Sequence, residues 1–136
     1  MTVSVQPTYL INRVITTAET ATTADAVVNL GRVSGLTLYC VFTYGSGGTT
    51  CRVWVQTSLD GGTTWIDIAD FSHTTASLTR GYSISNVGVA VTTLTDGALT
   101  ANTALNGFLG PIYRTKVTST GTYAGSTTLA VSVMSR

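Results

Sequence analysis

Few side chains of this protein have the chemistry that catalysis requires. There is one histidine, His73, and Asp70 and Ser72 stand beside it, so the residue types of a serine hydrolase triad are present. A triad needs side chains that converge from separate segments, whereas neighbours along one strand point to alternating faces. We therefore interpret His73 as a surface or loop histidine and expect no triad.

The six acidic residues offer no better catalytic or metal-binding pattern. A glycosidase needs two carboxyl groups that face each other across a sugar. Asp67 and Asp70 are three positions apart on a predicted strand and should point to opposite faces. Asp96 with Asn102 and Asn106 fits no calcium-loop spacing and indicates ordinary loop polarity. We expect a protein that is not an enzyme and that holds no cofactor and no metal.

The two cysteines, Cys40 and Cys51, are too few for a disulfide scaffold. Both occupy core-facing positions of predicted neighbouring strands, where they could pair across a hairpin if oxidised. The interpretation we favour is two buried free thiols that act as small apolar residues. Only His73 could join them at a metal, and it is not near them in the sequence.

The composition predicts that neighbouring protein subunits cover much of the surface. Of the 136 residues 43% are hydrophobic and only 10% are charged, against roughly 25% charged in ordinary soluble domains. A surface rich in threonine and poor in charge suits a protein that packs against copies of itself. The net charge of +1 comes with scattered basic residues, so we expect no nucleic-acid partner. No apolar run approaches the ~18 residues of a membrane span, and the first residues do not form a signal peptide, so we expect no membrane and synthesis in a cytosol.

Short alternating runs rich in β-branched residues and separated by glycines predict an all-β chain. We expect one antiparallel β-sandwich domain over residues 1–136, of jelly-roll or immunoglobulin-like type, with seven to nine short strands. Residues 1–8 would form an extended N-terminal arm. The expected strands are 9–17, 26–30, 36–44, 51–57, 65–71, 79–85, 112–120 and 126–134, with 87–93 continuing the sixth.

The same pattern predicts how these strands are arranged. Strands 36–44 and 51–57 would form one hairpin, and strands 112–120 and 126–134 the closing one, with the last strand inside a sheet. The first strand would place Leu10, Asn12, Val14 and Thr16 on one face. The irregular stretch 94–111 is long for a hairpin loop, and such loops often carry contacts.

The segment Ser-Leu-Asp-Gly-Gly-Thr-Thr-Trp, residues 58–65, predicts a tight and rigid hairpin. Asp60 can accept hydrogen bonds from backbone N–H groups just after it, and the two glycines supply the positive φ of such a turn. Trp65 can fold back over the turn and cover it. The motif therefore builds a corner and does no chemistry by itself.

This string resembles the Asp box of sialidases and other β-propeller proteins, Ser-x-Asp-x-Gly-x-Thr-Trp. The matching positions are Ser58, Asp60, Gly62, Thr64 and Trp65. In those families the box recurs once per blade and lies away from the active site, so the resemblance implies a structural turn. Here it occurs once in a chain too short for a six-bladed propeller, and no sialidase arginine triad can be assigned.

The chain as a whole resembles small virion proteins of tailed bacteriophages. The resemblance is one of overall style. It rests on a single hairpin motif in a short, threonine-rich chain with few charges. Two stretches add to it, Thr-Asp-Gly-Ala-Leu at 95–99 and Lys-Val-Thr-Ser-Thr-Gly-Thr-Tyr-Ala-Gly-Ser-Thr-Thr-Leu at 116–129. It implies a virion component in a symmetric assembly, with itself and the major capsid protein or another virion protein as partners. We favour a trimeric capsid decoration or cement protein, and a tail, connector or head-fibre component is the alternative.

The aromatic residues offer a function of another class, a small carbohydrate-binding module. Tyr39, Trp54, Tyr82, Tyr113 and Tyr123 could form an exposed platform that stacks sugars, although burial in a sheet face or a subunit interface is the interpretation we favour. Trp54 lies on the outward face of its strand, which is either covered or open to a partner. The expected partner contacts are Thr2, Val3, Val5, Tyr9, Trp54, Leu99, Leu105 and Phe108.

Overall fold

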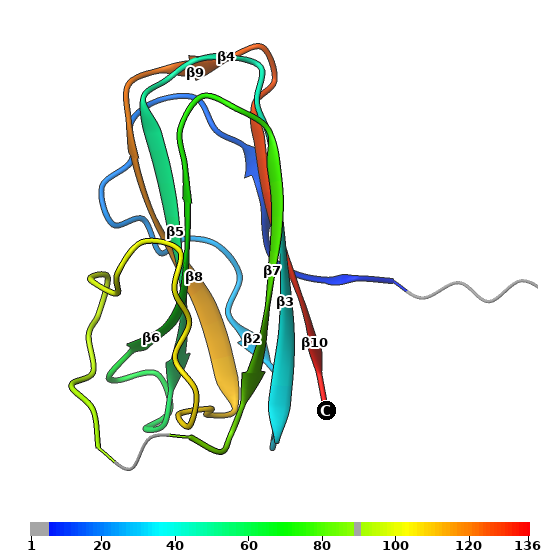
Figure 1. The fold of residues 1–136 in the computed structure, drawn as a ribbon, viewed down its shortest axis with the longest axis vertical. Coiled ribbons are helices and arrows are strands. Elements are labelled where there is room, and N and C mark those ends of the chain that lie inside the picture. The colour runs from blue at the N-terminus through cyan, green and yellow to red at the C-terminus, as the bar shows by residue number, and fades with distance from the viewer. Residues whose placement is uncertain (1–5, 89–90) are drawn as a thin grey trace, which may run out of the picture.

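Alternating residues build ten strands in the computed structural model, which describes residues 6–88 and 91–136 (Figure 1). Seven strands have seven to nine residues and three have only two. The strands are β1 (Thr8–Val14), β2 (Val28–Asn29), β3 (Gly35–Thr43), β4 (Ser46–Gly47), β5 (Thr50–Ser58), β6 (Ile66–His73), β7 (Leu78–Ser85), β8 (Ile112–Thr120), β9 (Tyr123–Ala124) and β10 (Thr128–Ser135). The described residues contain no helix, and so no helix that could span a membrane.

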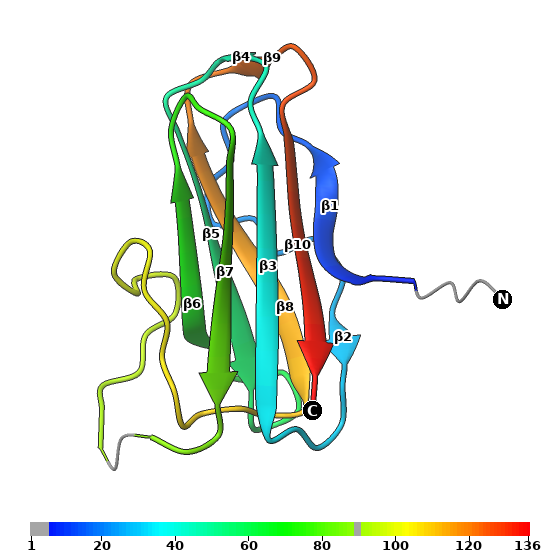
Figure 2. The ribbon, with the colours of Figure 1, turned by 45° about the vertical axis from the view of Figure 1, so that its right-hand side comes forward.

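The strands form two four-stranded antiparallel sheets that pack face to face. Sheet A has the order β1-β10-β3-β7, sheet B has the order β2-β8-β5-β6, and β4 pairs with β9 at one end (Figure 2). Among the eight main strands the first pairs with the last, the second with the seventh, the third with the sixth and the fourth with the fifth. This is one long hairpin rolled into a sandwich, which is the jelly-roll arrangement.

The core lies between the two sheets, and the alternation of β3 and β5 was predicted correctly. Leu38, Cys40 and Phe42 of β3 point inward, as do Val53 and Val55 of β5. All are at most 1% exposed and belong to one continuous hydrophobic cluster. At ~25 cal/mol per Å² of buried apolar surface, this cluster is the main source of the stability of the sandwich.

Both predicted hairpins are wrong, because each pair of strands lies in opposite sheets. β3 is in sheet A and β5 in sheet B, and the glycine-rich segment between them contains β4. β8 and β10 are likewise separated, and their connection contains β9. Strand alternation fixes which face is buried but does not identify the neighbouring strand. The expectation that the last strand lies inside a sheet is confirmed, since β10 lies between β1 and β3.

Two β-bulges change the predicted facing of side chains. In β1 the register shifts between Tyr9 and Ile11, so Leu10 and Ile11 are both buried while Val14 is 49% exposed. The predicted common face of Leu10, Asn12, Val14 and Thr16 is therefore wrong. Thr8 and Tyr9 belong to β1, so only Gln6 and Pro7 of the expected N-terminal arm lie before the strand among the described residues.

The second bulge is in β6, where Ala69 pairs with Val55 but Asp67 pairs with Gln56. Ile68 is the extra residue, because two steps on β6 correspond to one on β5. Asp67 and Asp70 consequently point to the same face, the outer face of sheet B, which corrects the prediction of opposite faces. The expected continuation of β7 over residues 87–93 is not a strand where it is described, and residues 89 and 90 lie outside the described part.

Two connecting segments cover the edges of sheet B. Thr22 forms a backbone bridge with Val117, which places the segment 16–25 along the free side of β8. On the opposite edge Ala104 bridges to Ala69, and the loop 94–111 follows β6. Residues 94–111 form no strand, as predicted.

Candidate functional site

The strand residues on the outer face of sheet A carry no charge, and the one charged group against this face is the Arg136 guanidinium, which lies over Gly35 at one end. The strand registers place the following residues on it: Tyr9, Asn12 and Val14 of β1, Thr128, Ala130, Ser132 and Met134 of β10, Thr37, Tyr39, Val41 and Thr43 of β3, and Thr79, Gly81 and Ser83 of β7. No described segment crosses this face (Figure 2). The ion pairs of the described residues all lie elsewhere.

This uncharged face has exposed apolar side chains at its middle and at one end. Tyr39 is 52% exposed and Met134 70% exposed, and Tyr9 stands beside them at 40%. Tyr9, Ser132 and Tyr39 lie in one row across three strands. A broad face of hydroxyl and apolar groups without charge can be buried against another such face without leaving an unpaired ion.

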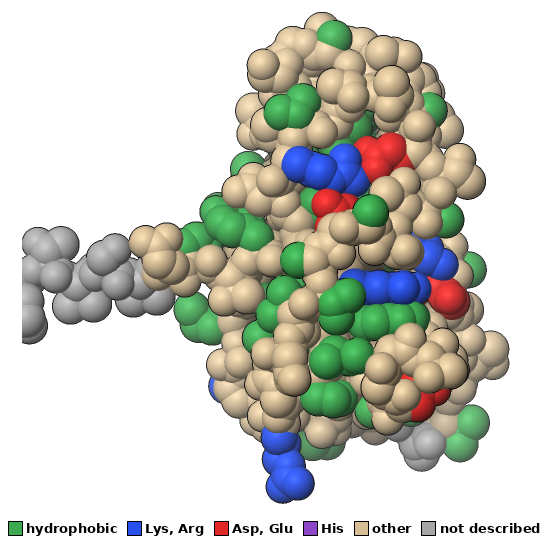
Figure 3. Space-filling view, turned by 180° about the vertical axis from the view of Figure 1, so that it is seen from behind, with side chains coloured by type: hydrophobic (Ala, Val, Ile, Leu, Met, Phe, Trp, Pro, Cys, Tyr) green, Lys and Arg blue, Asp and Glu red, His purple; other side chains and the backbone are tan. Residues whose placement is uncertain are grey.

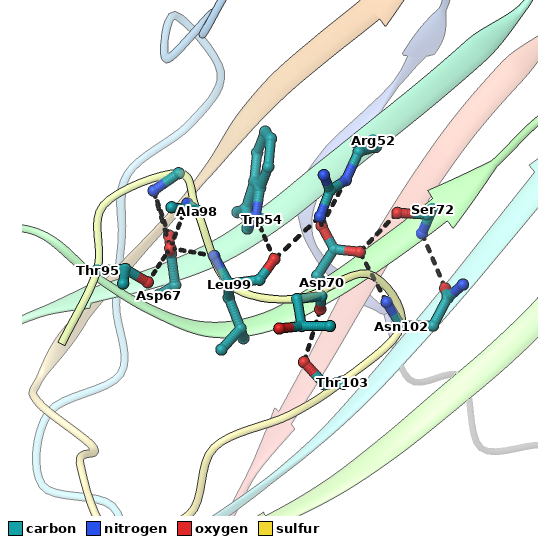
Figure 4. Close-up of polar contacts among 12 residues, drawn as sticks. Arg52, Trp54, Asp67, Asp70, Ser72, Thr95, Ala98, Leu99, Asn102 and Thr103 are labelled. Carbon is teal, nitrogen blue, oxygen red and sulfur yellow. Dashed lines mark hydrogen bonds and ion pairs between the residues drawn. The ribbon is translucent and has the colours of Figure 1, made fainter. Parts of the chain in front are cut away.

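The outer face of sheet B is different, because the loop 94–111 is bound to it through Asp67 (Figure 4). The Asp67 carboxylate is 1% exposed and accepts hydrogen bonds from three successive backbone N–H groups, those of Gly97 (2.8 Å), Ala98 (2.9 Å) and Leu99 (3.1 Å). The Thr95 hydroxyl donates to the same carboxylate at 2.7 Å, and Gln56 Nε2 donates at 2.8 Å. Asp67 therefore fixes the conformation of this part of the loop.

Asp70 binds the next part of the loop. Its carboxylate accepts hydrogen bonds from the backbone N–H of Asn102 at 2.9 Å and from the Ser72 hydroxyl at 2.7 Å, and it pairs with Arg52 at 3.0 Å. Arg52 and Trp54 both donate to the carbonyl oxygen of Leu99, at 2.9 Å and 3.1 Å. The loop thus covers Trp54, which is 5% exposed.

These contacts decide what the acidic residues can do chemically. The bulge brings Asp67 and Asp70 to one face, as a glycosidase pair would be, but donors of the protein itself surround both carboxylates. The calcium candidates also have separate partners, since Asp96 binds Lys116 while the side-chain oxygens of Asn102 and Asn106 accept backbone N–H groups of β6 and β7. The described residues contain no cluster of ligands that could hold a metal.

The glycine hairpin has the geometry that its sequence predicts. Asp60 accepts hydrogen bonds from the backbone N–H of Thr64 (2.8 Å) and of Thr63 (3.1 Å), and these bonds lower the pKa of its carboxyl group. The Ser58 hydroxyl accepts from the N–H of Gly62 at 2.9 Å and donates to Asp60 at 2.8 Å. Gly62 has a φ of +97°, which a side chain would strain.

Trp65 completes this corner. Its Nε1 donates to the carbonyl oxygen of Gly62 at 3.0 Å, and the Arg114 guanidinium lies 4.3 Å above its ring. The residue is only 9% exposed and Arg114 covers one face of its ring, so the ring is not available to stack a sugar. The hairpin is a structural element, as expected.

We predict that Ser58→Ala destabilises the corner, because Ser58 is completely buried and its hydroxyl joins Gly62 to Asp60. The expected loss in free energy of unfolding is about 1–2 kcal/mol, the usual effect of leaving buried partners unpaired. Urea unfolding followed by tryptophan fluorescence measures it. Leu59→Ala is the matched control, because Leu59 is 61% exposed and its loss should stay within about 0.5 kcal/mol. Equal losses in the two variants would contradict the structural role of Ser58.

His73 is buried, which corrects its interpretation as a surface or loop residue. Its side chain is 3% exposed and points into the core, where the ring stacks on Phe42 with centroids 4.6 Å apart. Its Nε2 lies 3.4 Å from Cys40 Sγ. Ser72 and Asp70 are on the opposite face of β6, so the three residues do not form a triad, as expected.

Cys40 and Cys51 are buried free thiols, which confirms the favoured interpretation. Burial raises the pKa of each thiol to about 12. They lie in opposite sheets, so they do not face each other across a hairpin, which was the alternative. Both thiols therefore act as small apolar residues at neutral pH.

The five aromatic residues proposed as a platform do not share a surface. Tyr113 and Tyr123 are buried in the core, and Tyr82 is partly buried and stacks on Phe71. Trp54 is under the loop on sheet B, and Tyr39 is on the opposite side of the molecule. Of these residues only Tyr39 is exposed.

The expected contact residues that the structure describes lie on two sides of the molecule. Thr2, Val3 and Val5 lie outside the described residues. Tyr9 is on the uncharged face, and Trp54 is covered. Leu99, Leu105 and Phe108 belong to the loop on sheet B and are each half-buried.

Sequence reasoning missed the uncharged face and the role of Asp67. Two acidic residues in a strand that is otherwise apolar, Ile-Asp-Ile-Ala-Asp-Phe at 66–71, indicate carboxylates that need internal donors. That signal could have identified Asp67 and Asp70 as binding groups for a loop. Comparison of the chain with family models, with curated proteins and with solved structures found no match.

Proposed function

We propose that this protein is a non-enzymatic structural component of a tailed-phage virion, a decoration protein that stabilises the head as a homo-oligomer. The observation that carries the proposal is the uncharged outer face of sheet A, which has no cover among the described residues. Jelly rolls occur in capsid and lectin domains alike, so the fold is compatible with a virion role but does not select it.

The uncharged face is suited to pack against a second copy of the chain. Away from Arg136 this face requires a partner without charge, because an ion placed there would be buried without a counterion. Four strands about 4.8 Å apart and about 25 Å long present on the order of 500 Å² in projection, and side-chain relief adds to this. Each partner in a standard interface contributes ~800 Å², so the face has the scale that a stable contact needs.

A non-enzymatic role agrees with how the carboxylates are bound. Asp67 and Asp70 are surrounded by donors that hold the loop, and neither has the open side that a substrate needs. The loop and the glycine hairpin together make one side of the sandwich rigid. A rigid block with one uncharged face suits repeated assembly, in which the same surface patch recurs at each contact.

The oligomeric mass of the purified protein tests the proposal, and we predict a discrete homo-oligomer, with a trimer favoured. Light scattering on a sizing column measures it. Ala130→Glu, in the middle of the uncharged face, should shift the mass to that of one chain without loss of the fold, because it buries an unpaired charge. Thr20→Glu, exposed on the sheet B side, is the matched control and should leave the mass unchanged.

Two results would overturn the proposal. One is a monomer at every concentration that also fails to co-sediment with empty heads of the phage that encodes it. The other is specific binding on a glycan array, which would favour the carbohydrate-binding module instead. If the oligomer persists in both Ala130→Glu and Thr20→Glu, the interface lies on another face.

A further inference from the structure

The edge of sheet A is incomplete at one end of β10. On its β3 side, β10 is paired as far as Ser135 with Leu36, and Arg136 continues with backbone hydrogen bonds to Gly35. On its β1 side, pairing stops at Val133 with Thr8. Among the described residues, no strand lies beside Met134 and Ser135 on that side. The last part of β10 is therefore an open strand edge, which is a template for a further strand.

A groove follows this open edge between the two sheets. It has a volume of about 550 Å³ and is lined by Pro7, Leu30, Val133 and Met134 together with Gln6, Thr8 and Ser135. A second groove of about 300 Å³ continues on the outer side of Pro7 and reaches Tyr39. Figure 3 shows hydrophobic side chains on the body beside the point where the N-terminal segment leaves it.

The chain's own N-terminal segment does not continue β1 along this edge where it is described. Gln6 and Pro7 are exposed and lead away from the sheets (Figures 1 and 2). Proline has no N–H to donate to β10, and its fixed φ takes the chain off the line of a strand. None of the described residues occupies the position that a longer β1 would take beside Met134.

The residues before Gln6 have the pattern of a strand with one apolar side. Thr2-Val3-Ser4-Val5 alternates hydroxyl and β-branched apolar residues with a period of two and carries no charged side chain. Beside the end of β10, the valines would face the apolar groove, while Thr2 and Ser4 would continue the hydroxyl-rich outer face of sheet A. The five residues 2–6, fully extended, span ~17 Å, which is enough to lie along the edge of a neighbouring copy.

We infer that residues 2–6 of one copy add as a strand to the open edge of β10 in a neighbouring copy. This inference rests on the proposed function, because it needs a homo-oligomer. The contact is head-to-tail, since each copy donates its N-terminal segment and accepts another at its groove. Such contacts close into a ring when the rotation between copies allows it. Backbone hydrogen bonds to β10 supply the attachment, and the valines in the groove supply the specificity.

Mixed cross-linking tests the exchange. A Val3→Cys chain is mixed with a differently tagged Met134→Cys chain, the oligomers are re-formed from dissociated chains, and the sample is oxidised and run without reductant. A covalent dimer containing both tags can form only between copies, and we expect at least tenfold more of it than with Thr20→Cys replacing Met134→Cys. The native Cys40 and Cys51 are buried and will not compete.

Two further variants separate the outcomes. Deleting residues 2–6 should shift the oligomer to the mass of one chain while the far-UV circular dichroism of the folded sandwich stays unchanged. A Val3→Cys/Met134→Cys double variant that cross-links only within one chain would overturn the inference, since the segment would then fold back on its own body. A deletion variant that remains oligomeric would also overturn it while leaving the proposed function intact. A wild-type monomer would instead remove the proposed function on which the inference rests.

Discussion

Replacing Asp67 by alanine will release the loop 94–111 from sheet B and lower the free energy of unfolding by about 3–4 kcal/mol. The carboxylate is 1% exposed and is the common acceptor of three backbone N–H groups, one hydroxyl and one amide. Hydrogen bonds to a charged acceptor contribute about 1.5–3 kcal/mol each. The expected loss is smaller than the sum over the five hydrogen bonds, because the donors on the released loop can form hydrogen bonds with water instead.

The release has a second consequence at Trp54. The carbonyl oxygen of Leu99 that accepts from Trp54 Nε1 and from Arg52 moves away with the loop. We expect Trp54 to become exposed in the folded variant, with a red-shifted emission before any unfolding begins. The loop should also become a site of rapid proteolysis, since its backbone loses its anchors.

Asp96→Ala is the matched control for Asp67→Ala, because it removes a carboxylate from the same loop. The Asp96 side chain is 49% exposed; it pairs with Lys116 at the surface and accepts one hydrogen bond from Gln56 Nε2 at 2.6 Å. Its loss should therefore cost about 1–2 kcal/mol, less than the loss of the five donors bound by Asp67. Urea unfolding and limited trypsin or proteinase K digestion measure both variants. If Asp67→Ala loses no more stability than Asp96→Ala and its loop stays resistant, Asp67 does not hold the loop.

Lowering the pH from 7 to 5 will reduce the stability of the wild-type protein by about 2 kcal/mol through His73. Burial, with a smaller contribution from the positive charge of Arg80, lowers the pKa of His73 from 6.5 to about 4. Nδ1 of the ring has no hydrogen-bond partner in the described part of the chain. The unfolded chain binds a proton near pH 6.5, whereas the folded chain does not until about pH 4.

The sign follows from that difference in proton binding. A group with a lowered folded-state pKa that is charged when protonated destabilises the fold as the pH falls below its unfolded pKa. The loss therefore begins near pH 6.5, grows by ~1.4 kcal/mol per pH unit and levels off near pH 4. Carboxyl groups of ordinary pKa are still mostly ionised at pH 5, so the window from 7 to 5 isolates the histidine.

His73→Leu is the variant that tests this prediction. It keeps an apolar side chain against Phe42 and removes the titrating group, so its unfolding free energy should change by less than about 0.5 kcal/mol between pH 7 and 5. Urea unfolding at four pH values in that window gives the comparison. A His73→Leu protein that loses as much stability as the wild type would show that another group carries the pH dependence.

The sequence determines some parts of this fold directly and leaves others open. The buried faces of β3 and β5 follow from strict alternation, and the Asp60 corner follows from residue types whose local bonds need no distant partner. The sheet to which each strand belongs does not follow, because β3 and β5 have inward faces whichever strands they pair with. The predicted hairpins failed for that reason.

The binding of the loop by Asp67 and Asp70 was harder to predict, because a single extra residue in β6 changes the face to which Asp67 points. The bulge at Ile68 puts Asp67 on the face of Asp70, and nothing in the local pattern distinguishes this from an unbroken strand. The burial of His73 could have been predicted from the sequence, because extending the strand alternation by two positions from buried Phe71 places His73 in the core. The uncharged outer face of sheet A is visible only once the order β1-β10-β3-β7 is known.

The rolled pairing of the sandwich also determines how the chain must acquire its structure. β1 pairs with β10, so Thr8 and Val133 meet across almost the whole length of the chain. Sheet A therefore lacks the strand between β1 and β3 until β10 has been synthesised. Until then the edges of β1 and β3 that face β10 have no partner. Domains built from such distant pairings fold in milliseconds to seconds, far more slowly than helical bundles. During that interval the open strands are most exposed to aggregation, so expression at low temperature or at a slow rate should raise the yield of soluble protein.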